Sequence, residues 1–160
     1  MKVATLGRAS GFTMVELVMV MVLIGVIAAI GVPRMMGNNT MAAAAFGDQV
    51  VSALRTAQKS AVARRRLVCA SVGASAVTLT MSPSSTRRNC TEPLNAETYS
   101  TSASGVTAAA SPSTLYFQPN GMITSDADGR TPVSGTVVIQ SDTSRTITFE
   151  GSTGHVQVVP

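Results

Sequence analysis

The chain has 160 residues, of which 12% are charged and 4% aromatic, with no tryptophan. Roughly 125 residues follow the apolar N-terminal region, enough for one small domain. The formal net charge of +4 falls to +2 if Lys2 and Arg8 leave with a leader, because 10 basic side chains then face 8 acidic ones. So small an excess identifies no nucleic-acid partner by charge alone. The abundance of Ser, Thr, Ala and Gly favours an exported, β-rich domain over a cytosolic enzyme.

The segment 12–32 is long and apolar enough to cross a membrane. As a helix its 21 residues would span about 31 Å, close to the thickness of a hydrocarbon core. From Leu17 to Val32 it contains no charged side chain. Three interpretations fit: a cleaved secretory signal peptide, a passive signal anchor, and an assembly helix in which Glu16 has a role. The length of the run disfavours the signal peptide.

Glu16 stands just before the uncharged stretch from Leu17 to Val32, and its carboxylate needs a positively charged partner. A carboxylate costs about 2.5 kcal/mol or more at the bilayer centre and less near the interface. Cleavage between Gly11 and Phe12 would create a positive α-amino group one helical turn from Glu16. Staggered helices in a bundle can pair these two charges, so the carboxylate indicates an assembly device with the membrane as a store of subunits.

The pattern Gly11-Phe12-Thr13-Met14-Val15-Glu16, followed by the apolar run and Pro33, closely resembles the class III signal of type IV prepilins and type II secretion pseudopilins. The resemblance implies cleavage after Gly11 by a prepilin peptidase, N-methylation of Phe12, and assembly through Phe12, Glu16 and the helix-loosening Pro33. Residues 1–11 would form the leader and 12–33 the transmembrane and assembly helix. Lys2 and Arg8 are expected to hold the leader on the cytoplasmic side of the inner membrane.

Residues 34–66 are expected to continue this helix as an amphipathic segment, with a break or hinge near the sequence GNN at 37–39. Within 40–66, apolar side chains recur at helical spacing and form one face: Phe46, Val50, Leu54, Ala57 and Ala61. Asp48 near the start and Arg64-Arg65-Arg66 at the end are expected to complement the helix dipole. The apolar face should pack onto a sheet.

Residues 67–160 are expected to form a β-rich periplasmic domain. The predicted strands are 67–72, 76–81, 115–117, 136–140, 145–149 and 155–159, with turns at 73–75, 141–144 and 151–154. The Ser/Thr/Ala/Pro-rich stretch 82–113 is interpreted as long loops with at most one weak strand. The predicted fold is therefore α+β and pilin-like: a long N-terminal helix packed on an antiparallel β-sheet domain.

Three later segments resemble the GspH/FimT branch of the pilin-like proteins. They are VVSALRTAQKSAVARRRLVCAS, LYFQPNGMIT with its Phe-x-x-x-Gly pattern, and ITFEGSTGHVQV. Within that branch, a minor pilin of an MSHA-type pilus is a close fit. The resemblance implies a minor pilin that assembles into, primes or caps a type IV pilus alongside other pilins. A type II secretion pseudopilin and a DNA-binding minor pilin for natural transformation are the alternatives.

Cys69 and Cys90 are the only cysteines. An even number of cysteines behind a membrane-targeting segment favours one disulfide in an oxidising compartment, and two buried free thiols are the alternative. A bridge would stabilise the domain by about 3 kcal/mol.

The basic clusters are Arg64-Arg65-Arg66 and Arg87-Arg88, each a few residues from a cysteine. A bridge would bring them to one end of the domain, as a solvated surface, a contact for DNA phosphates or a contact for a protein partner. DNA binding is expected to be weak, because the Gly-Arg-x-Arg segment of DNA-binding relatives is reduced here to Gly129-Arg130-Thr131-Pro132. We expect no enzyme activity, metal site or cofactor, since His155 has no convergent partners and no nucleophile motif is present.

Overall fold

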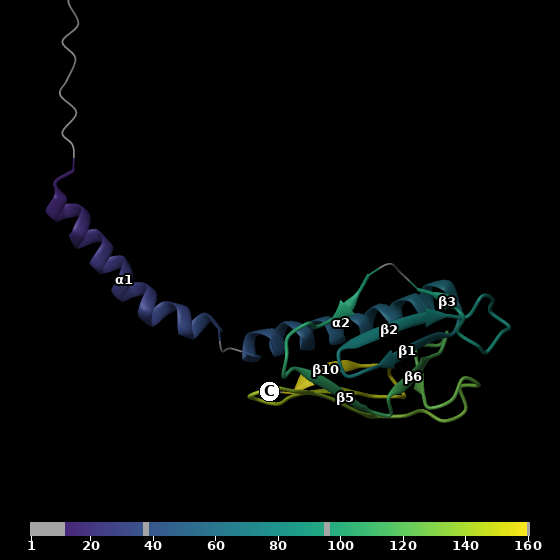
Figure 1. Cartoon of the computed structure of the whole chain (residues 1–160). Helices are drawn as coiled ribbons and strands as arrows, with labels where there is room; N and C mark the ends of the chain where they lie inside the picture. The colour runs from purple at the N-terminus through teal and green to yellow at the C-terminus, as the bar shows by residue number, and fades with distance from the viewer. Residues whose placement is uncertain (1–11, 37–38, 95–96, 160) are drawn as a thin grey trace, which may run out of the picture. The chain divides into compact units, whose positions relative to one another are not determined.

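The computed structural model describes residues 12–36, 39–94 and 97–159. The chain divides into two compact units between residues 38 and 39. The first contains α1 (Met14–Met36), and the second contains α2 (Asn39–Arg64) and the strands (Figure 1). Helix α1 continues past Pro33 to Met36. The predicted leader and the Gly37-Asn38 part of the predicted break lie outside the described residues.

Two antiparallel sheets make up the rest of the second unit. One has the strand order β3-β2-β1-β6-β7, with β4 also paired to β2, and the other has the order β10-β9-β8-β5. The first contains β1 (Val68–Val72), β2 (Ala76–Met81), β3 (Glu92–Pro93), β4 (Tyr99–Ser100), β6 (Thr114–Phe117) and β7 (Ile123–Thr124). The second contains β5 (Thr107–Ser111), β8 (Gly135–Gln140), β9 (Arg145–Phe149) and β10 (Val156–Val159). The predicted α+β fold is confirmed.

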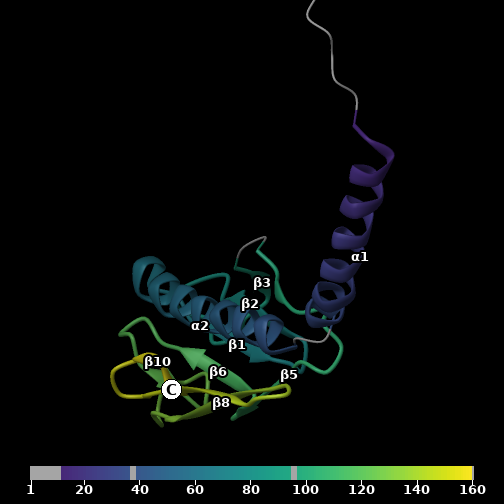
Figure 2. The same ribbon diagram turned by 90° about the vertical axis from the view of Figure 1, so that its left-hand side faces the viewer.

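Helix α2 runs along both sheets and supplies one wall of the core (Figures 1 and 2). The predicted apolar face is the buried face: Phe46, Val50, Leu54, Ala57 and Ala61 are all at most 1% exposed. It packs on inward-facing strand residues such as Val68, Leu115 and Ile147. Because three of its further core positions are Ala43, Ala53 and Gly47, the helix axis can lie close to the strands.

Polar contacts fix α2 to the second sheet. The guanidinium of Arg145 donates to the carbonyl oxygen of Ala44 at 2.9 Å and lies 3.0 Å from the carboxylate of Asp48. A Cβ at Gly47 would lie 3.3 Å from Arg145, so this glycine makes room for the crossing side chain. Asp48 was expected to complement the helix dipole, but it lies beyond the first turn of α2 and pairs with Arg145 instead.

Further along α2, Gln58 ties two turns together. Its side-chain amide donates to the carbonyl oxygens of Gly121 and Thr153, each at 3.3 Å. Gly154, beside Thr153, has a φ of +69°, and a Cβ there would collide with the Gln58 amide and the Gly121 carbonyl. The Phe117–Gly121 turn, which carries the predicted Phe-x-x-x-Gly pattern, therefore packs against the β9–β10 turn.

The strand predictions are correct to within one residue at each end for the six predicted strands. Strand β5, by contrast, lies inside the stretch that was interpreted as loops. Its sequence TAAAS has low β-propensity, and only Ala108 in it is buried. All five of its residues pair with β8, so tertiary pairing rather than local preference makes this strand. Strands β3, β4 and β7 have two residues each, too few to show an alternating pattern.

Helix α2 ends two residues earlier than predicted because Arg65 adopts a left-handed conformation, with φ +51°. The amide of Arg65 donates to the carbonyl of Val62, and the amide of Arg66 donates to the carbonyl of Ala61. This pair of bonds defines a Schellman motif, in which glycine usually occupies the left-handed position. A side chain is disfavoured there by roughly 1 kcal/mol.

Arg65→Gly should therefore raise the free energy of unfolding by about 0.5–1 kcal/mol, since glycine adopts a positive φ without strain. The matched control is Arg64→Gly, which removes the same charge from the last helical residue and should lower stability by a similar amount. Urea unfolding of the full-length protein in detergent micelles, followed by circular dichroism, measures both. Equal destabilisation by the two glycines would contradict the assignment of Arg65 as the capping position.

Candidate functional site

The first turn of α1 is organised by Thr13. The amide of Glu16 donates to the Thr13 hydroxyl at 3.2 Å, and the amide of Leu17 donates to the Thr13 carbonyl at 3.1 Å. Thr13 is thus the N-cap of the helix, and Glu16 stands three residues later, the spacing of a capping box. The Glu16 carboxylate also lies in the first turn, where the helix dipole stabilises a negative charge.

Thr13 was not singled out as a site residue, although the sequence carries its signal. A Thr followed three residues later by Glu, just before an apolar run, marks a helix start. Both residues lie at the start of α1, so the position of the Glu16 carboxylate relative to the start of the helix is fixed by this cap.

The surface of α1 is apolar on every side. From Met14 to Ile30 every side chain is exposed, including Leu23, Ile24 and Ile27. Residues Met14–Gly31 form a helix long and apolar enough, by length and composition, to cross a membrane. A helix that is apolar all round needs an apolar environment, either lipid or other helices. No described residue of the first unit covers these apolar side chains.

Phe12 precedes the helix and is 82% exposed. Gly11, its predicted cleavage partner, lies outside the described residues. Cleavage and methylation at this bond therefore stay predictions. Pro33 lies within α1, three residues from its end.

Cys69 and Cys90 form a disulfide with a Cα–Cα distance of 6.1 Å. Cys69 is in β1, and Cys90 lies in the segment between β2 and β3. The bridge closes a loop across a sequence separation of 21 and holds that segment against the sheet. The expected disulfide is present, in place of the alternative with two free thiols.

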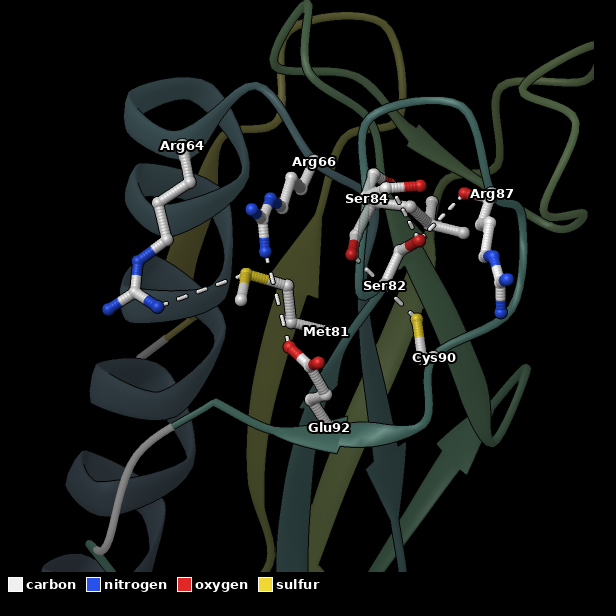
Figure 3. A network of polar contacts seen from close by, with 9 residues as sticks. Arg64, Arg66, Met81, Ser82, Ser84, Arg87, Cys90 and Glu92 are labelled. Carbon is white, nitrogen blue, oxygen red and sulfur yellow. Dashed lines mark hydrogen bonds and ion pairs between the residues drawn. The ribbon is translucent and has the colours of Figure 1, made fainter.

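The two arginine clusters lie at the same end of the second unit, which we call the basic end: Arg64, Arg65, Arg66, Arg87 and Arg88. The Ser82 amide donates to the Leu67 carbonyl, so the chain leaving β2 passes the chain entering β1. The buried Ser82 hydroxyl donates to the carbonyls of Ser84 and Arg87, both at 2.8 Å (Figure 3). These bonds shape the loop that carries Arg87 and Arg88.

The charges of the basic end are only partly compensated. Arg66 lies 4.0 Å from Glu92, an exposed pair that contributes little to stability. Arg64 points a guanidinium nitrogen at the sulfur of Met81, 3.9 Å away (Figure 3). In the described part of the chain, Arg65, Arg87 and Arg88 are exposed and take part in no ion pair.

His155 is exposed in the turn before β10, and its amide donates to the Thr153 hydroxyl. The described residues contain no group of three His, Cys, Asp or Glu side chains that could hold a metal ion. Arg130, in the shortened Gly-Arg segment, lies 3.4 Å from Asp128 and is not part of the basic end.

Comparison with known proteins gives a fold and no sequence relative. No family model matches the chain, and no curated protein matches it. Two solved structures of the type IV minor pilin FimU from Pseudomonas aeruginosa PAO1, in space groups P21 and P65, are similar. The first is 19% identical, covers 73% of this chain and 87% of its own, and has a TM-score of 0.55. The second is 18% identical, covers 73% of this chain and 91% of its own, and has a TM-score of 0.51. The chain therefore has a pilin-like fold: an N-terminal apolar helix, then a second helix packed on antiparallel sheets.

Proposed function

We propose that the protein is a minor pilin that assembles into a type IV pilus and primes or caps the filament. One observation carries the proposal: an exposed helix, apolar at every position from Leu17 to Ile30 and with a carboxylate in its first turn, precedes a unit of pilin-like fold. The resemblance of the head to prepilin signals and the description of FimU as a type IV minor pilin support it. Within type IV pili, the resemblance of the later segments to the GspH/FimT branch favours an MSHA-type pilus.

The proposed mechanism stores the subunit in the inner membrane, with the second unit in the periplasm. A prepilin peptidase cuts after Gly11, and the new amine of Phe12 becomes the positive partner of Glu16 on a neighbouring pilin. Thr13 starts the helix between these two charges. Transfer into the filament then exchanges lipid for neighbouring helices around α1, and the ion pair sets the stagger between subunits.

Cleavage between Gly11 and Phe12 is the first expected outcome. Mass spectrometry of the mature protein from membranes should show a polypeptide that starts at an N-methylated Phe12. Gly11→Leu should block the cut and leave the leader in place, while Ser10→Leu, one residue upstream, serves as the control. A mature protein that starts after the apolar run would contradict the proposal.

Glu16→Gln should leave the protein in the membrane but prevent its incorporation into pili. Glutamine keeps the shape of the side chain and can still close the capping box, so the loss isolates the charge. Glu16→Ala should fail equally, although removal of a charge near the hydrocarbon favours membrane residence. Immunoblots of sheared pili and of the membrane fraction measure both.

Thr13→Val is the control for the helix cap. It removes the hydroxyl that accepts from the Glu16 amide but keeps the carboxylate. If incorporation requires the charge pair, this change should lower pilus incorporation less than Glu16→Gln does. Pili that contain the Glu16→Gln variant at the normal level would refute the pairing mechanism.

Deletion of the gene distinguishes the pilus from a secretion filament. We expect a loss of surface pili, measured by electron microscopy and shearing, with normal export of folded periplasmic proteins. The reverse result would identify the protein as a type II secretion pseudopilin. Either result is read against complementation with the unaltered chain.

The basic end supports a second candidate function, the binding of DNA phosphates. Five phosphate contacts give a salt slope of about −4.5, so affinity for duplex DNA should fall about 500-fold between 50 and 200 mM salt. Arg87→Gln with Arg88→Gln should reduce the slope by about 2. The control is the double variant Lys59→Gln with Arg130→Gln, because both residues are exposed and lie outside the basic end. Gel retardation of the micelle-bound protein measures these slopes, and binding at 200 mM salt that survives loss of Arg87 and Arg88 would contradict this site.

A further inference from the structure

The sheet face turned away from α2 carries a set of hydroxyl side chains. In β1, β2 and β6 the inward residues are buried and apolar, such as Val68, Leu79 and Leu115. The alternate positions face outward and carry hydroxyls: Ser71, Thr78, Thr80, Thr114 and Tyr116. We call these five residues the outer face. The disulfide at Cys69 lies in the middle of the same surface.

Strand register arranges the outer face in two rows across the sheet. In one row Cys69 is opposite both Thr80 and Tyr116, and in the other Ser71 is opposite both Thr78 and Thr114. Neighbouring strands lie about 4.8 Å apart, so the hydroxyl residues Thr78, Ser71 and Thr114 repeat at that interval, whereas Thr80 and Tyr116 lie two strands apart with the disulfide between them. This interval is close to the length of one pyranose ring along a polysaccharide.

Walls turn this surface into a trough of about 420 Å³. Two loops contribute to its lining: Arg88, Asn89 and Cys90, which we call the first wall, and Ala127, which we call the second wall. The disulfide and the Ser82 hydrogen bonds hold the first wall in place. Asp126 holds the second, because its carboxylate accepts from the amides of Arg130 and Thr131 at 3.2 and 3.1 Å.

The polar groups of the trough have unused hydrogen-bonding capacity. Within the ranges that the structure describes, no hydroxyl of the outer face makes a hydrogen bond, and neither the Arg88 guanidinium nor the Asn89 amide has a partner. The carboxylates next to the second wall, those of Asp126 and Asp128, already have partners. The backbone amide of Arg130, followed by those of Thr131, Gly129 and Asp128, lowers the pKa of Asp126, and the Asp128 carboxylate lies 3.4 Å from Arg130. Arg88 thus faces a trough without a competing anion among its lining residues.

This combination selects one class of ligand. The lining has one cation and five hydroxyl side chains, so a ligand held here pairs mainly with hydroxyls, whereas duplex DNA is held mainly by cations along its phosphates. An added strand needs a free sheet edge, but the floor is a sheet face. A chain of sugar rings with one carboxylate per ring offers hydroxyls for the rows and a carboxylate for bidentate pairing with an arginine.

We propose that this trough binds an acidic polysaccharide, a polyuronate that lies across β2, β1 and β6 with a carboxylate on Arg88. The inference is independent of the proposed pilus role, because all lining residues of the trough lie in the second unit of this chain. The probes are short oligogalacturonates, with neutral dextran oligomers of equal length for comparison. Isothermal titration calorimetry uses the full-length protein in detergent micelles.

Arg88→Gln should weaken oligogalacturonate binding about tenfold or more, as expected for loss of a charged hydrogen bond. Arg87→Gln removes the same charge from the neighbouring residue, which does not line the trough, and should change the affinity by less than about twofold. Tyr116→Phe and Thr78→Val remove single hydroxyls and should each weaken binding severalfold. Thr107→Val, an exposed threonine of the other sheet, should have no effect.

Circular dichroism and thermal unfolding show which variants retain the fold, so loss of binding is read only from folded protein. Equal affinity for dextran and oligogalacturonate would overturn the role of Arg88. Equal losses from Arg87→Gln and Arg88→Gln would replace the trough with diffuse attraction to the basic end. Competition of oligogalacturonate by an equally charged oligonucleotide at the same concentration would assign the surface to nucleic acid and overturn the proposal.

Discussion

The second unit depends on one packing interaction, the burial of the apolar face of α2 against both sheets. Phe46, Val50 and Leu54 are almost fully enclosed, and each buried side chain of this size stabilises the fold by about 1.5–3 kcal/mol. The helix packs on both sheets, so a polar substitution at Leu54 would weaken the core that the two sheets share. The outward-facing positions of the strands do not contribute to this core. The hydroxyl residues of the outer face occupy such positions.

Helix α1 differs from α2, because its apolar side chains are exposed rather than buried. Its side chains are as apolar as a core, yet nothing within its own described unit covers them. In the assembly proposed above, lipid and neighbouring helices would satisfy this surface equally well, because both offer hydrocarbon and neither competes for hydrogen bonds. Exchange between the two environments would then carry a small difference in hydrophobic free energy. On that scale the proposed ion pair of Glu16 would be large enough to decide the direction.

Sequence reasoning succeeded wherever one local signal determined the outcome. Helical spacing of Phe46 to Ala61 identified the packed face, and alternation identified the longer strands. It failed at β5, where five weak residues pair with β8, and at Arg65, where a non-glycine residue adopts the left-handed cap. Thr13 carries the signal of a helix cap in its spacing to Glu16 alone. The hydroxyl rows, in contrast, were beyond reach, because Ser71 meets Thr78 and Thr114 only once the register of three strands is fixed.

The contact of Arg145 with the start of α2 has a mechanical consequence. Any tension transmitted along the chain from the N-terminal helix enters this unit at Asn39 and acts to peel the first turns of α2 away from the sheets. Arg145 binds those turns through the Ala44 carbonyl and the Asp48 carboxylate, and it lies in β9, between β8 and β10 of the second sheet. The load therefore passes to a strand that is hydrogen-bonded on both sides, where bonds must break together rather than one after another. In the proposed filament, a pull on the chain would have to break the Arg145 contacts with Ala44 and Asp48 before the following turns of α2 could leave the sheets.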